Sequence, residues 1–204
     1  IRERRIEILF QFTKDKRVFN FLKGQGFKVK EFKINEEIKL SSEVETKITK
    51  HDFYDSSLIV KTPDTKILNL NDSPIREEGE IKKFKKENGE FDILLSQFSY
   101  AAWKGGRENI NYRINAANEK LLTIEKQAKI LNCKTIIPFA SFIYFSNELN
   151  FYMNDCINTP EIVKKFFNDK KFNIVFFAPG ENQIAQNLIQ KDSSLSFWKE
   201  KYSN

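Results

Sequence analysis

The stretch "TKILNLNDSP" (residues 65–74) places a carboxylate at the end of an apolar run. Its apolar run reads as a strand that ends on Asn71 and Asp72, and Ser73 and Pro74 then turn the chain. A carboxylate at the tip of a buried strand has two interpretations. In the first, Asp72 accepts hydrogen bonds from the backbone of a turn. In the second, the strand holds Asp72 rigidly as a metal ligand or an acid–base group, and the rest of the chain must decide between the two.

The segments around this stretch predict a hairpin and, before it, a helix and a strand. Residues 56–62 and 66–72 read as two strands joined by the turn residues 63–65. Apolar residues at near-helical spacing predict a helix over 3–24. Alternation of apolar and charged residues over 27–34 predicts a strand with one solvent-exposed face.

Strands and helices alternate in the second half of the chain. The predicted segments are strands at 91–98, 134–140 and 172–181 and helices at 109–133 and 158–169. Thr159 and Pro160 suit the N-cap and first position of the later helix. Residues 75–90 are charged and expected to be exposed, and the tail from 184 is expected to be helical at first. Helices that alternate with strands cover a sheet, so the fold class is α/β and residues 1–204 form one compact unit.

Composition excludes several classes of protein. The 204 residues are 40% hydrophobic and 30% charged, as in soluble globular proteins. The longest apolar run, 135–145, is too short and too polar to span a membrane, and the charged start lacks the pattern of a signal peptide. Cys133 and Cys156 are expected to be free thiols of a cytoplasmic protein. Because the first residue is Ile, the chain is expected to be trimmed or part of a longer protein.

The net charge of +6 does not by itself predict nucleic-acid binding. Most of the basic residues are lysines, and clusters such as residues 82–87 are bounded by acids. Nucleic acid is therefore disfavoured as a partner. His51 is the only histidine, so a zinc site built from several imidazoles cannot be completed within this sequence.

Polar residues gather where three of the predicted strands end. In layered α/β folds, sites form at strand ends, although every strand must also end in solvent. The polar ends are Asn71 and Asp72, then Ser96, Gln97 and Ser99, and then the segment from Ser141 to Asn147.

His51 lies just before the predicted hairpin, and Asp72 lies at its end. Because a hairpin folds back on itself, the two side chains are expected to come within reach of one metal ion. An imidazole nitrogen and a carboxylate oxygen are ordinary ligands of zinc or iron. The alternative is that His51 is a surface histidine beside a turn.

The segment "HDFYDSSLIVKTPDTKILNLND" (51–72) resembles the middle of a metallo-β-lactamase-fold protein. The segments "DILLSQFSYAAWKGG" (92–106) and "KTIIPFASFIYFSNELNFYMND" (134–155) are similar to the metallo-β-lactamase-like domain of CMP-N-acetylneuraminate hydroxylase and of related bacterial Rieske-type sugar-nucleotide hydroxylases. The resemblance covers about residues 15–180. It implies the C-terminal portion of an αββα layered sandwich.

The resemblance also implies roles for single residues. His51 matches the family's third histidine motif, and Asp72 matches the bridging aspartate, which would bind zinc or iron and take part in catalysis. Asn147 stands where the family's final histidine is expected, and an amide oxygen is a weaker ligand than imidazole. The family's opening His-x-His-x-Asp-His motif is missing, so either it lies on a part of the protein outside this chain or the protein has lost it.

The remaining polar and aromatic residues would then form a substrate pocket. The expected substrate-binding residues are Asn71, Ser96, Gln97, Ser99, Trp103, Tyr144 and Asn147. Gly105 and Gly106 before a helix would admit a phosphate to backbone N–H groups, and Arg107 and Arg113 would supply charge. Core packing for the aromatics and a turn for the glycines are the alternatives.

The resemblance implies a metal-dependent hydrolase-like domain that acts on a phosphorylated or nucleotide-linked sugar. The alternative is a metal-free binding or scaffold module of the same fold that holds a sugar nucleotide or a protein partner. Because half of a sandwich leaves an apolar sheet face and an open edge, the chain is expected to associate with the missing N-terminal half or as a homodimer.

Overall fold

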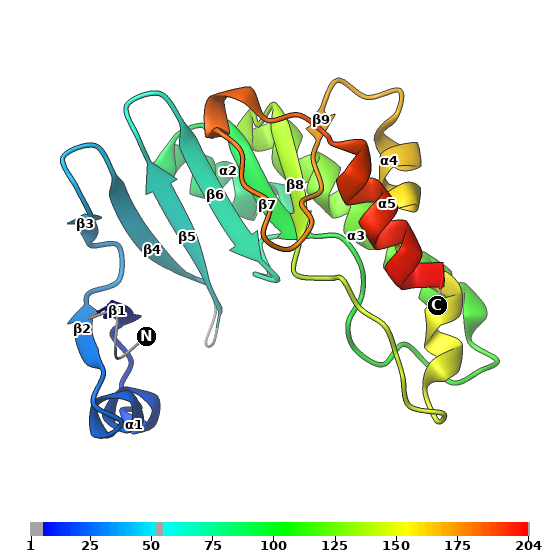
Figure 1. Ribbon diagram of the computed structural model, residues 1–204, viewed down its shortest axis with the longest axis horizontal. Helices are drawn as coiled ribbons and strands as arrows, with labels where there is room; N and C mark the ends of the chain where they lie inside the picture. Colours follow the sequence, from blue (N-terminus) through cyan, green and yellow to red (C-terminus); the bar gives the residue numbers. More distant parts are fainter. Residues whose placement is uncertain (1–5, 52–54, 204) are drawn as a thin grey trace.

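The computed structural model describes residues 6–51 and 55–203. In these residues the main sheet has seven strands in the order β3-β4-β5-β6-β7-β8-β9 (Figure 1). The first four strands are antiparallel to their neighbours, and β6 to β9 run parallel. The strands are β3 (Glu37–Lys39), β4 (Glu45–His51), β5 (Asp55–Lys61), β6 (Lys66–Asn71), β7 (Ile93–Gln97), β8 (Thr135–Phe139) and β9 (Asn173–Ile174).

Helices α2 (Glu78–Asn88) and α3 (Ile110–Leu131) pack together behind the sheet in the view of Figure 1. The core lies between these helices and the sheet. Leu68, Leu94 and Ile136 are paired across β6, β7 and β8, and all three are fully buried. They belong to one cluster with Leu121 and Ile124 of α3, which confirms the apolar stripe predicted for this helix.

The far end of the sheet is covered by α4 (Pro160–Phe167) and α5 (Asp192–Ser203), which pack against each other. Thr159 caps α4 through a hydrogen bond from the Ile162 amide to its Oγ1, and Pro160 is at the first helical position, as predicted. Two 3₁₀ helices complete the described elements: η1 (Phe151–Cys156) and η2 (Ala185–Asn187). None of the helices in the described residues is long and apolar enough to cross a membrane.

The N-terminal residues differ from the prediction. The helix expected over 3–24 is replaced, in its described part, by strand β1 (Glu7–Gln11) and the shorter helix α1 (Arg17–Gly24). Strand β1 pairs in parallel with β2 (Lys28–Phe32) and forms a separate two-stranded sheet. The apolar residues of β1 also fit a two-residue period, so their spacing is compatible with both a helix and a strand. Pairing with β2, 21 positions away, selects the strand.

Three other segments also differ from prediction. Residues 75–90 contain a capped helix, α2, that buries Ile81 and Phe84 rather than lying fully exposed. Strand β9 has two residues, because the Phe176 amide donates to the Gln190 side chain instead of continuing the sheet ladder. The tail begins with η2 and irregular backbone, and its helix, α5, comes at the end.

The face of the sheet opposite α2 and α3 carries a second set of apolar side chains. Alternation places Leu58, Ile67, Leu95 and Ile137 there, and each is half-buried. Within the described residues, no helix packs on β5 and β6 from this side (Figure 1). This is where the predicted missing half or second copy would bind, and that association stays a prediction.

Glu181 connects the segment after β9 to α5. Its carboxylate accepts hydrogen bonds from the Ser194 hydroxyl, the Ala178 amide (3.1 Å) and the Gln183 amide group (2.8 Å), and it pairs with Lys191 (3.2 Å). Burial alone would raise the pKa of this carboxyl, but the hydrogen bonds outweigh it and lower the pKa from 4.5 to about 2.

We expect this carboxylate to make stability depend on pH in the acid range. The pKa is lower in the folded chain than in the unfolded chain, so the stabilisation is present above about pH 4.5 and is lost as the pH falls toward about 2. The loss should be on the order of 2 kcal/mol. Urea unfolding at several pH values should show a smaller acid-induced loss in Glu181→Gln than in the wild type. A Glu200→Gln control, at an exposed position, should behave like the wild type.

Candidate functional site

The carboxyl ends of β6, β7 and β8 lie at one edge of the sheet, because these strands are parallel neighbours. Two non-glycine residues at this edge have a left-handed backbone: Asn71 (φ 51°) and Ala140 (φ 59°). This conformation is tolerated by asparagine and is strained for alanine. Strained backbone is common at functional sites, so we take this carboxyl edge as the candidate site.

Asp72 stands on the tip of β6, as the sequence indicated. The Asn71 amide donates to the Asn69 side chain (2.9 Å), and the Ser73 amide donates to the Leu70 carbonyl (2.8 Å), which closes the turn. The Asn71 side chain donates to the Asp72 carboxylate (2.9 Å), and both side chains are exposed. The backbone amide in this turn therefore bonds the Asn69 side chain rather than Asp72, and the role of the exposed Asp72 carboxylate as a metal ligand or acid–base group stays a prediction.

Lys120 reaches the same edge from α3, and sequence reasoning missed it. Its Nζ donates to the Gln97 Oε1 at the end of β7, and the side chain is half-buried. Burial lowers the pKa of this amine to about 8, with nearby Arg76 acting in the same direction. A signal was present in the sequence, because Lys120 lies three residues after Ala117 and so borders the buried stripe of α3.

Ser96 is turned into the protein. Its side chain is 4% exposed, and its hydroxyl donates to the Gln127 side chain (2.9 Å), which in turn donates to the Ile75 carbonyl (2.7 Å). This chain of hydrogen bonds ties β7 to α3 and to the segment after β6. The predicted ligand contact of Ser96 stays a prediction, and in the structure its hydroxyl already has a partner.

Ser99 is fully buried and, like Ser96, forms hydrogen bonds that join segments of the protein. Its hydroxyl accepts a hydrogen bond from the Asn158 amide (2.9 Å), and its carbonyl accepts one from the Ser141 hydroxyl (3.1 Å). These contacts hold together the segments that follow β7 and β8. Of the residues predicted at the end of β7, Gln97 is the one whose side chain contacts Lys120.

His51 is the last residue of β4, and its ring faces α2. Its Nε2 lies 3.1 Å from the Thr49 hydroxyl and 2.8 Å from the Ser57 hydroxyl, and the ring lies 5.4 Å from the ring of Phe84. Burial lowers the pKa of this imidazole. The neighbouring groove, of about 670 Å³, is lined by residues of β4 and α2, including Glu80.

His51 and Asp72 thus have different surroundings. His51 is bonded to hydroxyls of β4 and β5, whereas Asp72 lies close enough to Lys120 to affect its pKa. Across residues 6–51 and 55–203, no three His, Cys, Asp or Glu side chains are grouped so that they could hold a metal ion. Catalytic zinc needs about three protein ligands, so the described residues do not fit a complete metal centre. Asp72 supplies one available carboxylate.

The predicted aromatic and amide residues lie in the loops beyond the edge. Trp103 is 69% exposed, and Tyr144 is 45% exposed with its ring edge-on to Phe151. The Asn147 side chain accepts a hydrogen bond from the Leu149 amide (2.9 Å) in an exposed turn. The exposure of Trp103 and Tyr144 suits stacking on a ligand, and their substrate-binding role stays a prediction.

The glycine and arginine residues expected to bind phosphate have partners within the protein. Arg113 is 1% exposed, donates two hydrogen bonds to the Asp155 carboxylate (2.9 and 2.8 Å), and also donates to the Gly106 carbonyl (2.5 Å). The Gly106 amide donates to the Asn109 side chain (2.8 Å). The alternative interpretation, a structural turn, therefore describes this segment, and Arg113 is a buried anchor.

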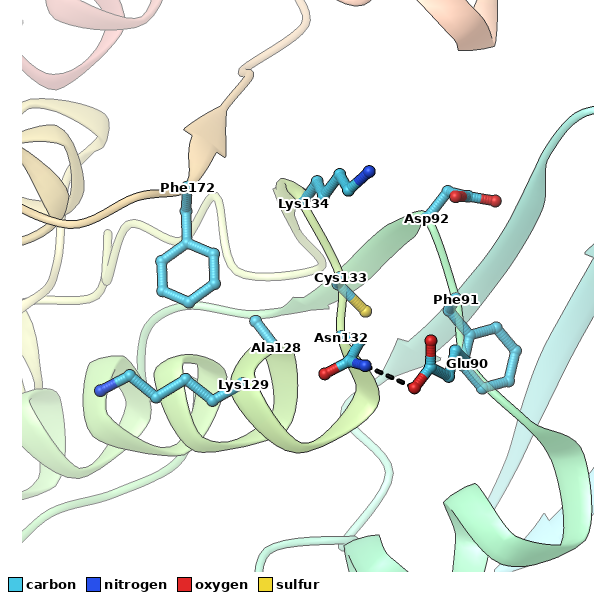
Figure 2. A pocket seen from close by; sticks show the side chains of 9 residues that line it. All are labelled: Glu90, Phe91, Asp92, Ala128, Lys129, Asn132, Cys133, Lys134 and Phe172. Atoms are coloured by element: carbon cyan, nitrogen blue, oxygen red, sulfur yellow. Dashed lines mark hydrogen bonds between the residues drawn. The ribbon is translucent and has the colours of Figure 1, made fainter.

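A different pocket, of about 610 Å³, lies at the opposite edge of the sheet (Figure 2). Asp92 and Lys134 border it at the amino ends of β7 and β8, and the Asn132 side chain donates to Glu90. Cys133 is buried there, and burial raises the pKa of its thiol to about 12, so the thiol is unreactive. Sites in such sheets form at the carboxyl ends, so we do not assign function to this pocket.

Both predicted thiols are free in the structure. The Cys156 thiol is half-buried next to Asp155, and burial raises its pKa to about 11. Neither cysteine lies at the carboxyl edge with Asp72 and Lys120.

The chain matches no protein-family model, and no curated protein matches its sequence. Among solved structures it resembles CmlA, a diiron β-hydroxylase from Streptomyces venezuelae, with a TM-score of 0.54 and 12% identity over 82% of this chain and 38% of CmlA. The E377D mutant of CmlA gives a TM-score of 0.58 and 13% identity over 84% of this chain and 38% of that one. The metallo-β-lactamase-fold protein YhfI from Bacillus subtilis gives a TM-score of 0.50 and 10% identity over 88% of this chain and 66% of YhfI.

These likenesses show the fold. The sheet and its helices match metallo-β-lactamase-fold structures, which confirms the predicted α/β fold class. The chain spans little more than a third of CmlA and just under two thirds of YhfI. The resemblance to sugar-nucleotide hydroxylases is not supported by these structures.

Proposed function

We propose that this chain is an enzyme-like domain of a metal-dependent protein that acts on a phosphorylated or nucleotide-linked sugar. The observation that carries the proposal is the exposed Asp72 carboxylate in a tight turn at the tip of β6, with the hydrogen bond between Lys120 and Gln97 at the same carboxyl edge. Ligands bind at this edge in layered α/β folds, and fixed polar groups of both charges orient them there.

The metal part of the proposal draws support from the fold. One structural neighbour, CmlA, is a diiron protein, and zinc or iron are the metals that the sequence resemblance implied. The described residues contain no group of three potential ligands, so a complete metal site would need ligands from outside these residues in addition to Asp72. We therefore assign no catalytic step to a metal ion here.

The sugar part draws support from the exposed aromatic rings. Trp103 and Tyr144 lie in the loops that follow β7 and β8, and aromatic faces stack on sugar rings and bases. The specific substrate class comes from the sequence resemblance.

A metal-free binding module is the second candidate. It is favoured by the hydrogen bonds that already occupy the Nε2 of His51, and by the lack of a metal-holding cluster in the described ranges. In that case the carboxyl edge would bind a sugar nucleotide without chemistry.

Elemental analysis of the full natural polypeptide separates the two. We expect about one zinc or iron per chain, and Asp72→Asn should weaken metal binding by at least about tenfold, because the substitution removes an anionic ligand and keeps the shape. An Asp64→Asn control, in the exposed hairpin turn, should keep wild-type metal content. A metal-free wild type would overturn the enzyme proposal in favour of the binding module. Equal metal content in wild type and Asp72→Asn would remove Asp72 from the ligand set.

A further inference from the structure

The N-terminal unit of the chain, made of β1, α1 and β2, has little core of its own. No residue of α1 is buried, and each residue of β1 is exposed or half-buried. The extensive contacts of the unit are those of β2 with β1 and with α1, and Figure 1 shows the unit at the end of the main sheet away from α2 to α5. Two parallel strands are not stable alone and normally belong to a larger, covered sheet. The unit is therefore incomplete in the described residues.

The backbone of β1 has one edge bonded to β2 and one edge without a strand. The Phe12 amide donates to the Phe32 carbonyl (2.9 Å), so every second residue of β1, counted back from Phe12, directs its N–H and C=O groups toward β2. No third strand in the described residues pairs with the other edge. The groups that point away from β2 are those of Glu7, Leu9 and Gln11.

Other outer strands of the described residues are protected against further pairing. The outermost strands of the main sheet, β3 and β9, have three and two residues. In β2, Lys28, Lys30 and Glu31 are charged. Short and charged strands are the usual means by which proteins protect the edges of a sheet. Strand β1 has five residues and an apolar run over 8–10, so it lacks both kinds of protection.

The sequence of β1 fits a second copy of itself in antiparallel register. The register that is centred on Leu9 places this residue opposite the same residue of the second copy. It also places Ile8 opposite Phe10, an aliphatic–aromatic pair of the kind that stabilises sheets. Glu7 then lies opposite Gln11, so no like charges meet. The residues that face outward, Glu7, Leu9 and Gln11, are those that exchange backbone hydrogen bonds in this register.

We propose that β1 is a dimerisation strand, through which two copies of this chain pair about a two-fold axis at Leu9. Each copy contributes its two-stranded sheet, so the dimer has one four-stranded sheet in the order β2-β1-β1-β2. A sheet of this size can be stable where two strands are not. The contact uses the same surface on both copies, so it closes on itself and leaves neither β1 with a free edge. The proposal does not depend on the metal or the ligand of the proposed function.

Sedimentation equilibrium of the full natural polypeptide, over a range of protein concentrations, tests the proposal. We expect the wild type to form dimers. Leu9→Pro should raise the dimer dissociation constant about tenfold to hundredfold, because proline removes an outward N–H from both copies and leaves the bonds between β1 and β2 in place. A wild type that stays monomeric would overturn the proposal. Slow hydrogen exchange of the Leu9 amide in such a monomer would assign the edge to another segment of the same polypeptide.

Substitutions at Gln11 test the register and keep the backbone of β1 unchanged. In the dimer Gln11 lies opposite Glu7 of the second copy. Gln11→Lys should therefore lower the dissociation constant and Gln11→Glu should raise it, each by about two- to tenfold, because the two-fold axis repeats the charge pair. Asn118→Lys and Asn118→Glu are the matched controls on the exposed face of α3 and should leave it unchanged. Equal dissociation constants for the two Gln11 variants would overturn the proposal, and matching thermal unfolding of these variants would show that folding is not the cause of a difference.

Discussion

Replacing Asp155 by alanine is expected to lower the free energy of unfolding by about 3 kcal/mol. The reason is the burial of its partner. Arg113 is 1% exposed, and Asp155 receives two hydrogen bonds from its guanidinium. The pairing also raises the pKa of Arg113 and lowers the pKa of Asp155. Without the carboxylate, a buried charge would remain with carbonyl partners alone. The Asp155 side chain is 35% exposed, which places the expected loss at the lower end for a buried pair.

Urea unfolding of the wild type, Asp155→Ala and Glu161→Ala tests this expectation. Glu161 pairs with Lys199, and both side chains are more than half exposed, so Glu161→Ala should change stability by less than about 1 kcal/mol. If Asp155→Ala were no less stable than Glu161→Ala, the pair would not be an anchor. Arg113 would then be free to serve as the phosphate-binding residue that the sequence indicated.

The parts of the fold that were predicted correctly are those with a local cause. The stripe of α3 repeats within a few residues, and the cap of α4 depends on Thr159 and Pro160, which stand side by side. The strands before and after α3 are short apolar runs bounded by polar residues. Each of these patterns is complete within one segment, so it can be read without knowing the rest of the fold.

The incorrect predictions concern residues whose conformation depends on distant partners. The apolar residues of β1 fit both a helix and a strand, and the pairing with β2 decides between them. The short β9 ends because the Gln190 side chain, 14 residues later, takes the Phe176 amide. Propensity cannot show such contacts, because they are set by tertiary packing.

The candidate site shows the same limit. Asp72 and Gln97 could be predicted at strand ends, because parallel strands bring their carboxyl ends together. The sequence could not show that Ser96 and Arg113 bond to other side chains of the protein. Their partners, Gln127 and Asp155, lie 31 and 42 positions away. Lys120 was missed for a related reason: a lysine beside an apolar stripe usually extends into solvent, and only the fold shows that it meets the end of β7.

Asn158→Ala is expected to destabilise the fold by about 2–3 kcal/mol. Asn158 is 3% exposed, and its side-chain amide donates to the carbonyls of Phe98 (2.7 Å) and Ala117 (2.8 Å). The first carbonyl follows β7 and the second belongs to α3, so one side chain joins the strand end to the helix that carries Lys120. Truncation leaves the buried Phe98 carbonyl without this donor, which costs about 1–3 kcal/mol unless water replaces it, and removes a second bond from the Ala117 carbonyl, which keeps its hydrogen bond within α3.

Two comparisons make the Asn158 expectation specific. Asn168→Ala, at an exposed position after α4, should be nearly neutral in urea unfolding. Asn158→Asp should be at least as destabilising as Asn158→Ala, because it keeps the volume but directs a carboxylate at two carbonyl oxygens. If Asn158→Asp were instead as stable as the wild type, the hydrogen bonds of the amide would not be what holds β7 to α3. The position of Lys120 at the carboxyl edge would then depend on apolar packing alone.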